Sequence, residues 1–299
     1  MTSVETEVQQ FRASLDKLRS EIGKVMVGQQ DIIEGVLAAV FGGGHVLLEG
    51  LPGLGKTKLV KTLAATLDLK FSRIQCTPDL MPADIIGTTI LAEDERGRRG
   101  FEFQRGPLFG NIILTDEVNR ATPKTQSALL QAMQENAVTV STTTYPLAQP
   151  FFVLATQNPI ELEGTYPLPE AQLDRFMLKL LIPPSDLASL VTILERTTTG
   201  EEAEAAKVLS SAEVVAARRL VANVPAAPAL LNYAARVVLA THADQPGAPA
   251  SVRSYVKYGF KRAAPAGLRH RLILNFEGEA AGIKPDAILA DVLQAVQEV

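Results

Sequence analysis

One stretch near the N-terminus has the residue types and spacing of a phosphate-binding loop. Glycines there would let backbone amides turn towards the phosphates of a nucleoside triphosphate, while Lys56 reaches the terminal phosphates and Thr57 ligates Mg²⁺. A bare glycine turn would need neither the Lys-Thr pair nor an apolar run before it. The stretch matches the pattern G-x-x-x-x-G-K-[ST] at every fixed position and consists of Gly50, Leu51, Pro52, Gly53, Leu54, Gly55, Lys56 and Thr57.

An acidic pair follows a second apolar run. Asp116 and Glu117 come shortly after the Ile-Ile-Leu segment at 112–114. One carboxylate can bind Mg²⁺ through water, and the next can polarise a water molecule for attack on a γ-phosphate. Because an Asp-Glu pair after a strand is also an ordinary turn, its catalytic interpretation depends on the phosphate loop.

Two more polar residues lie next to apolar runs. Asn158 follows the run at 151–155, where its amide could position the attacking water, although a polar turn before proline would have the same sequence. Arg175 precedes the run at 177–182. Such an arginine is usually solvated, but it can also be an arginine finger that stabilises charge at the nucleotide of a neighbouring subunit.

The elements that position these residues can be read from the hydrophobic pattern. Helical spacing separates the short apolar runs, which predicts a parallel sheet with helices on both faces and function at the carboxyl ends of its strands. Two helices are expected before the phosphate loop. The predicted strands cover 45–49, 71–76, 111–115, 151–155 and 177–182.

The sequence changes character after two prolines at 183–184. Ser210 and Glu213 fit a capping box at the start of one of the helices expected there. We therefore predict an α/β nucleotide-binding domain over 1–183 and a helical domain over 184–299. The later helical patterns cover 187–197, 212–221, 229–241 and 285–296.

Composition narrows the class of protein. The 299 residues are 46% apolar, yet no apolar run is long enough to span a bilayer and the N-terminus lacks a secretory signal, so we expect a cytoplasmic protein. The net charge of −4 argues against extended nucleic-acid contact. Cys76 is the single cysteine, so an internal disulfide and a cysteine-rich zinc site are excluded.

Several segments together resemble the MoxR family of AAA+ ATPases. This resemblance implies an α/β AAA+ P-loop NTPase core with a five-stranded parallel sheet, followed by a small all-helical lid. The segments are the phosphate loop, 115–121 (Thr-Asp-Glu-Val-Asn-Arg-Ala), 126–135, 155–159 (Ala-Thr-Gln-Asn-Pro), 168–176 and 268–277.

The resemblance also implies roles for individual residues. Family members form rings, usually hexamers, that hydrolyse ATP between protomers. Asn158 matches the family's sensor-1 asparagine, and Arg175 matches the finger that acts in trans. Two hairpins expected over 88–105 and 137–147 face the pore or partners in the family. The segment that packs near the adenine corresponds to Val27, Gly28 and Gln29.

The work implied by the resemblance is chaperone-like remodelling, assembly or metal-centre maturation of client proteins. The partners expected are other copies of the chain, client proteins and, beside them, a protein with a von Willebrand factor A domain. A DNA-remodelling relative such as a helicase or clamp loader is disfavoured by the acidic charge balance and the lack of a basic, aromatic binding surface.

The sequence departs from the family's pattern after Gly259. Family members continue from a similar Tyr-Gly pair with Ala-Ser-Pro-Arg, whose arginine is sensor 2, whereas here 260–262 read Phe-Lys-Arg. Relative to that pattern about 25 residues, the equivalent of two helices of mean length, are absent, and no sensor-2 residue is assigned. If this difference is a true deletion, the lid is shortened. An alternative function therefore stays open, namely an ATP-binding assembly scaffold with little or no turnover.

Overall fold

The computed structural model describes residues 3–51, 53–93, 99–158, 164–198, 203–258 and 270–296. The chain forms two compact units. The first comprises Met1–Leu168 and Leu180–Ala222, and the second Pro169–Lys179 and Asn223–Val299. The first unit thus keeps two helices that follow residue 183, and the domain boundary expected there stays a prediction.

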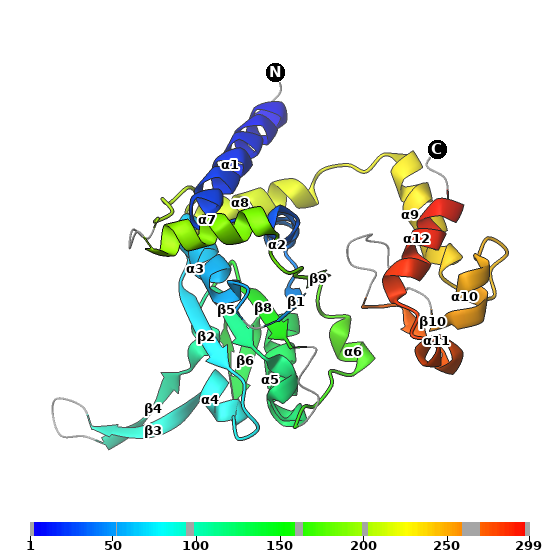
Figure 1. Ribbon diagram of the computed structural model, residues 1–299. Helices are drawn as coiled ribbons and strands as arrows, with labels where there is room; N and C mark the ends of the chain where they lie inside the picture. Colours follow the sequence, from blue (N-terminus) through cyan, green and yellow to red (C-terminus); the bar gives the residue numbers. More distant parts are fainter. Residues whose placement is uncertain are drawn as a thin grey trace. The chain divides into compact units, whose positions relative to one another are not determined.

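A five-stranded sheet forms the centre of the first unit (Figure 1). Its strand order is β2-β5-β8-β1-β9, and β5 pairs in parallel with both β2 and β8, as β8 does with β1. This arrangement confirms the predicted α/β class. The strands are β1 (Val46–Glu49), β2 (Phe71–Gln75), β5 (Ile112–Asp116), β8 (Phe152–Gln157) and β9 (Leu178–Leu181).

The two central strands explain why polar residues gather at one edge of the sheet. All five residues of β5 are buried, and β8 is buried up to its last residue, because helices cover both faces of a central parallel strand. Each strand therefore reads as a continuous apolar run that changes to polar residues at its carboxyl end. The parallel register brings these polar ends together.

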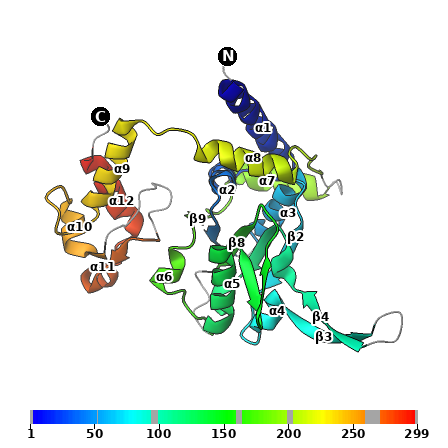
Figure 2. The same cartoon turned by 180° about the vertical axis from the view of Figure 1, so that it is seen from behind.

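Helices cover the sheet, and α8 packs along α2 in both views (Figures 1 and 2). Arg218 of α8 donates from Nε to the Val40 carbonyl near the end of α2, at 2.6 Å. The predicted capping box forms, since Ser210 N–H donates to Glu213 Oε2 at 2.7 Å. The helices of this unit are α1 (Ser3–Val25), α2 (Gln30–Gly42), α3 (Lys56–Thr66), α4 (Pro82–Ile86), α5 (Pro123–Glu135), α7 (Leu187–Thr198) and α8 (Ser211–Ala222), with 3₁₀ turns η1 (Pro107–Phe109) and η2 (Val118–Arg120).

A buried histidine joins α5 to the central sheet. The backbone N–H of Val153 donates to His45 Nδ1 at 3.0 Å, so Nδ1 is unprotonated and the ring proton resides on Nε2. Nε2 lies 3.2 Å from the Met133 carbonyl, which accepts that proton. Burial lowers the pKa of His45 to about 4. This side chain therefore bonds as a neutral imidazole.

Both predicted hairpins form, and an aromatic cluster connects them. The first consists of β3 (Gly87–Glu93) and β4 (Arg99–Arg105), and it extends away from the sheet in both views (Figures 1 and 2). The second consists of β6 (Ala137–Val140) and β7 (Thr143–Pro146). The Phe103 ring of β4 stacks on Tyr145 of β7 with centroids 4.5 Å apart, and Phe109 packs edge-on against Phe103.

In the described part of the second unit, helices occur together with a short antiparallel pair, β10 (Val256–Tyr258) and β11 (Ile273–Leu274). The sequence had predicted helices alone there. Among the residues described, no helix combines the length and the apolar character needed to cross a membrane. The segment 259–269, which contains the expected break, lies outside the described residues. The helices are α6 (Glu170–Leu173), α9 (Pro228–Ala240), α10 (Ala250–Tyr255), α11 (Phe276–Ala280) and α12 (Pro285–Ala295).

Candidate nucleotide-binding site

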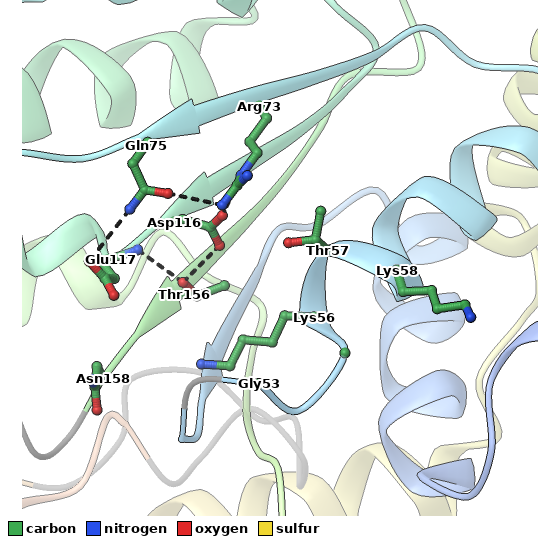
Figure 3. Close-up of a pocket in the computed structure, with 11 residues that line it drawn as sticks. Gly53, Lys56, Thr57, Lys58, Arg73, Gln75, Asp116, Glu117, Thr156 and Asn158 are labelled. Atoms are coloured by element: carbon green, nitrogen blue, oxygen red, sulfur yellow. Dashed lines mark hydrogen bonds and ion pairs between the residues drawn. The ribbon is translucent and has the colours of Figure 1, made fainter. Parts of the chain in front are cut away.

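A cavity of about 420 Å³ lies at the carboxyl ends of the sheet's strands (Figure 3). It is the place where a parallel α/β sheet usually binds its ligand. Two glycines of the predicted phosphate loop, Gly53 and Gly55, line it together with five predicted polar residues. These five are Lys56, Thr57, Asp116, Glu117 and Asn158.

The phosphate loop joins β1 to α3 in a conformation that requires glycine. Gly53 has φ +82° and Gly55 has φ +76°, a region in which other residues are strained. The amides at the start of α3 have no partner inside the helix and can bind an anion. Pro52 lies outside the described residues. The loop therefore has the backbone shape that a phosphate-binding site needs.

Lys56 supplies the positive charge of the loop. Its Nζ donates to the Gly50 carbonyl at 2.5 Å, which folds the side chain back over the loop (Figure 3). Burial lowers its pKa, while the nearby charges of Asp116, Glu117 and Glu49 act in the opposite direction. The ammonium thus faces the acidic residues across the cavity, where terminal phosphates would need it.

The segment 27–29 contacts the phosphate loop. Gly28 and Gln29 both have positive φ, at +69° and +58°. The Gln29 side chain donates from Nε2 to the Leu54 carbonyl at 3.1 Å. A Cβ atom on Gly28 would lie only 2.9 Å from Ser189 Oγ of α7, so this turn is closely packed. Whether Val27 and its neighbours contact an adenine stays a prediction.

Asp116 ends β5 and is held from both neighbouring strands. Arg73 of β2 donates from Nε to Asp116 Oδ2 at 2.7 Å. Thr156 of β8 donates from its hydroxyl to Asp116 Oδ1 at 3.3 Å. Among the described residues, each carboxylate oxygen therefore has a protein partner, and these partners fix the plane of the carboxylate.

Glu117 follows in a left-handed backbone conformation, with φ +55°. Its N–H donates to Thr156 Oγ1 at 2.9 Å. Its carboxylate oxygen Oε2 accepts from Arg120 Nη1 at 3.1 Å, and Gln75 Nε2 lies 3.5 Å away. The chain turns sharply at this residue, and the side chain reaches the cavity beside Asp116 (Figure 3).

The two remaining predicted residues lie in different units. Asn158 is buried just beyond the end of β8 and lines the cavity. Arg175 belongs to the second unit, where its exposed side chain donates from Nη1 to the Ala171 carbonyl at 3.0 Å. It is not one of the residues that line the cavity. The roles assigned to both residues stay predictions.

The donor set fits Mg²⁺ bound jointly with phosphates. Among the described residues, no group of three or more His, Cys, Asp or Glu could hold a metal ion unaided. Mg²⁺ commonly takes one or two protein oxygens and completes its shell with water and substrate phosphates. Thr57 turns its hydroxyl towards Asp116 (Figure 3), so these two residues offer such oxygens from α3 and β5.

Sequence reasoning missed Arg73, Gln75 and Thr156, all of which line the cavity. A signal existed for the first two, because they are polar residues inside the predicted strand at 71–76, among the apolar Phe71, Ile74 and Cys76. Thr156 lies in the segment 155–159, which was interpreted only through Asn158. Its importance depends on strand order, which periodicity does not reveal.

Comparison with known proteins places this geometry in a family. Residues 45–178 match the ATPase family associated with various cellular activities (AAA). The chain is 38% identical to Chaperone MoxR1 of Mycobacterium tuberculosis, over 95% of this chain and 82% of that protein. The chain belongs to the MoxR family of AAA+ ATPases. The predicted resemblance is thereby confirmed.

Two further similar proteins match nearly the whole chain. YeaC of Bacillus subtilis, an uncharacterised protein, is 40% identical over 95% of this chain and 94% of its own length. A crystal structure of a proposed ATPase from Cytophaga hutchinsonii superposes with a TM-score of 0.91 at 41% identity, covering 99% of this chain and 98% of the other. The family likeness therefore includes the second unit as well as the sheet.

Proposed function

We propose that this MoxR-family protein binds ATP with Mg²⁺ and hydrolyses it. The observation that carries this proposal is the convergence on one cavity of Lys56, Thr57, Asp116, Glu117 and Asn158. They come from a helix start and the ends of two parallel strands. Each has the chemistry required for one part of phosphoryl transfer to water.

Binding is assigned to the phosphate loop and to Asp116. The loop amides and the Lys56 ammonium would hold the β- and γ-phosphates, and the Thr57 hydroxyl would ligate Mg²⁺. When bound, the metal supplies charge neutralisation on the phosphate oxygens. Asp116 would accept hydrogen bonds from the metal's water ligands, with its carboxylate plane already fixed by Arg73 and Thr156.

Water activation is assigned to Glu117 and Asn158. The Glu117 carboxylate would accept a proton from the attacking water, and the Asn158 amide would orient that water. The left-handed backbone at Glu117 brings its side chain out of the strand direction and to the cavity. Asn158 reaches the same cavity from the neighbouring strand β8, which supports a shared role.

Arg175 is assigned to a neighbouring subunit's nucleotide. Its side chain is exposed, and its hydrogen bond to the carbonyl of Ala171 lies within its own short segment. A guanidinium held by one exposed hydrogen bond can reorient outward at a small cost in free energy. The proposed active form is a homo-oligomeric ring, with six subunits in the family's usual form, that hydrolyses ATP at subunit interfaces.

Hydrolysis would drive chaperone-like remodelling, assembly or metal-centre maturation of client proteins. The name of the relative Chaperone MoxR1 supports work of this kind. A protein with a von Willebrand factor A domain is proposed as a partner, from family resemblance alone.

The test is the rate of phosphate release per protomer measured against protein concentration. A site completed by a second subunit should gain activity as rings assemble, with Mg²⁺ required throughout. Light scattering on the same samples records the assembly state. A rate per protomer that stays constant across the range where rings dissociate would contradict the intersubunit site.

An ATP-binding assembly scaffold with little turnover is the second candidate. The ion pair between Arg120 and Glu117 favours it, because the carboxylate oxygen Oε2 already accepts from a guanidinium at 3.1 Å. Nucleotide binding with ring assembly but without phosphate release would support this function. Turnover that disappears in Arg175→Ala would exclude it.

A further inference from the structure

Thr156 lies between two residues of the proposed hydrolytic site. Its Oγ1 accepts from the Glu117 N–H at 2.9 Å and lies 3.3 Å from Asp116 Oδ1. The side chain is 2% exposed, so bulk water does not compete for these bonds. A single hydroxyl on β8 thus contacts both members of the acidic pair that ends β5.

The directions of the two bonds follow from chemistry. A backbone N–H can only donate, so the Thr156 oxygen must accept from Glu117. The one hydroxyl proton then remains for Asp116, whose carboxylate accepts it. The bond to Glu117 is the shorter of the two, and the bond to Asp116 is long for a hydroxyl donor. Both bonds can therefore form at the same time.

The contact matters because Glu117 has an uncommon backbone conformation. With φ +55° the residue occupies a region that side chains disfavour, and surrounding structure must hold it there. The N–H that Thr156 binds belongs to the same residue, so this bond fixes the turn that brings the carboxylate to the cavity. Loss of the bond would let the turn relax.

We infer that Thr156 is a positioning residue, whose hydroxyl sets both the direction of the Asp116 carboxylate and the backbone that carries Glu117. This inference rests on the proposed ATP hydrolysis at the same site. Asn158 follows two residues later and lines the same cavity. Thr156 therefore connects the strand of the proposed water-orienting amide to the proposed base and metal carboxylate.

Three substitutions test the inference. Thr156→Val keeps the branched shape and removes the hydroxyl, whereas Thr156→Ser keeps the hydroxyl. The matched control is Thr115→Val on the adjacent strand β5, because that threonine is also buried and its hydroxyl has no hydrogen-bond partner. Thr115 lines a separate small pocket with Cys76 rather than the nucleotide cavity.

Thr156→Val should lower kcat about tenfold or more while changing KM for ATP by less than about threefold, since a charge-assisted bond at the acidic pair is lost. It should also raise the Mg²⁺ concentration that gives half-maximal activity. Thr156→Ser should stay within about threefold of wild type in kcat and in the Mg²⁺ requirement. Thr115→Val should match wild type.

The outcomes separate this inference from the proposed function. If wild type turns over ATP and Thr156→Val keeps its kcat and Mg²⁺ requirement, the positioning role is wrong and hydrolysis stands. A serine variant as impaired as the valine variant would assign the defect to packing and overturn the inference. If wild type releases no phosphate, the proposed hydrolysis is wrong. The positioning role of Thr156 is then tested by the Mg²⁺-dependent binding of a fluorescent ATP analogue. A raised Mg²⁺ requirement in Thr156→Val supports the inference, and an equal one overturns it.

Discussion

Arg73 and Asp116 form an ion pair between neighbouring strands, with Nε of the arginine 2.7 Å from Oδ2 of the aspartate. The Asp116 side chain is largely buried, while that of Arg73 is about half exposed. A guanidinium therefore lies against the carboxylate proposed to hold the metal's water ligands. It orients Asp116, and its positive charge also opposes a second cation at the same place.

Replacing Arg73 by Gln should lower the Mg²⁺ concentration needed for half-maximal nucleotide binding by about twofold to fivefold, because a partly screened positive charge is removed. Titration of Mg²⁺ against a fluorescent ATP analogue measures this effect. Arg73→Lys keeps the charge and should stay close to wild type. This change in the Mg²⁺ requirement is opposite in direction to the one expected for Thr156→Val, since Thr156 orients Asp116 without carrying charge. A raised requirement in Arg73→Gln would show that orientation dominates over repulsion.

Glu117→Gln should lower steady-state ATP turnover by about 100-fold or more while ATP still binds, because an amide cannot accept the proton of the attacking water. Phosphate release and equilibrium binding measure the two quantities separately. Glu135→Gln is the matched control, since Glu135 is exposed near the end of α5 and contacts Gln131. Unchanged turnover in Glu117→Gln would remove this residue as the base.

Arg175→Ala and Lys56→Ala should each abolish hydrolysis, yet an equal mixture should regain it. An Arg175→Ala subunit keeps its phosphate loop, and a Lys56→Ala neighbour supplies the missing arginine. Random mixing in a ring would make about a quarter of the interfaces competent. Phosphate release after mixing and reassembly is the measurement. No recovery in rings shown to contain both variants would argue that Arg175 does not act in trans.

Stability should fall as the pH drops from about 6.5 towards 4, in part through His45. The folded chain keeps this imidazole neutral because burial lowers its pKa to about 4, whereas the unfolded chain binds a proton near pH 6.5. The stabilising effect is thus complete above the unfolded pKa and is lost on acidification, by up to ~3 kcal/mol. Urea unfolding of wild type and His45→Gln across this range should show a flatter pH dependence in the variant. Parallel curves would contradict the assignment.

The strands were predictable because a buried strand of a parallel sheet appears in the sequence as a continuous apolar run. The predicted segments 111–115 and 151–155 match β5 (Ile112–Asp116) and β8 (Phe152–Gln157) within one or two residues, since each is a continuous apolar run with a polar end. The pair formed by β10 and β11 was not expected. Its strands have two or three residues each, and such short segments carry no measurable periodicity.

The sequence predicted the motif residues of the candidate site but not the residues that hydrogen-bond to them. Lys56 and Thr57 follow from a fixed pattern, and Asp116 and Glu117 from their position after a buried strand. Arg73 and Thr156 contact Asp116 only because β5 lies between β2 and β8 in the sheet. That order depends on how crossover connections pack, and residues 43 and 40 positions away in the chain become neighbours through it.

The stacked rings of Phe103 and Tyr145 have a mechanical consequence. They connect two hairpins that are separate in sequence, and the second hairpin begins at Ala137, two residues after α5 ends at Glu135. The N-terminal end of α5 follows the turn that carries Glu117. A force on the projecting hairpin of β3 and β4 is therefore transmitted through these rings to the hairpin of β6 and β7. From there it reaches the helix α5 rather than a loop. The hairpin contact therefore lies at the C-terminal end of α5, and the proposed catalytic residue Glu117 lies before its N-terminal end.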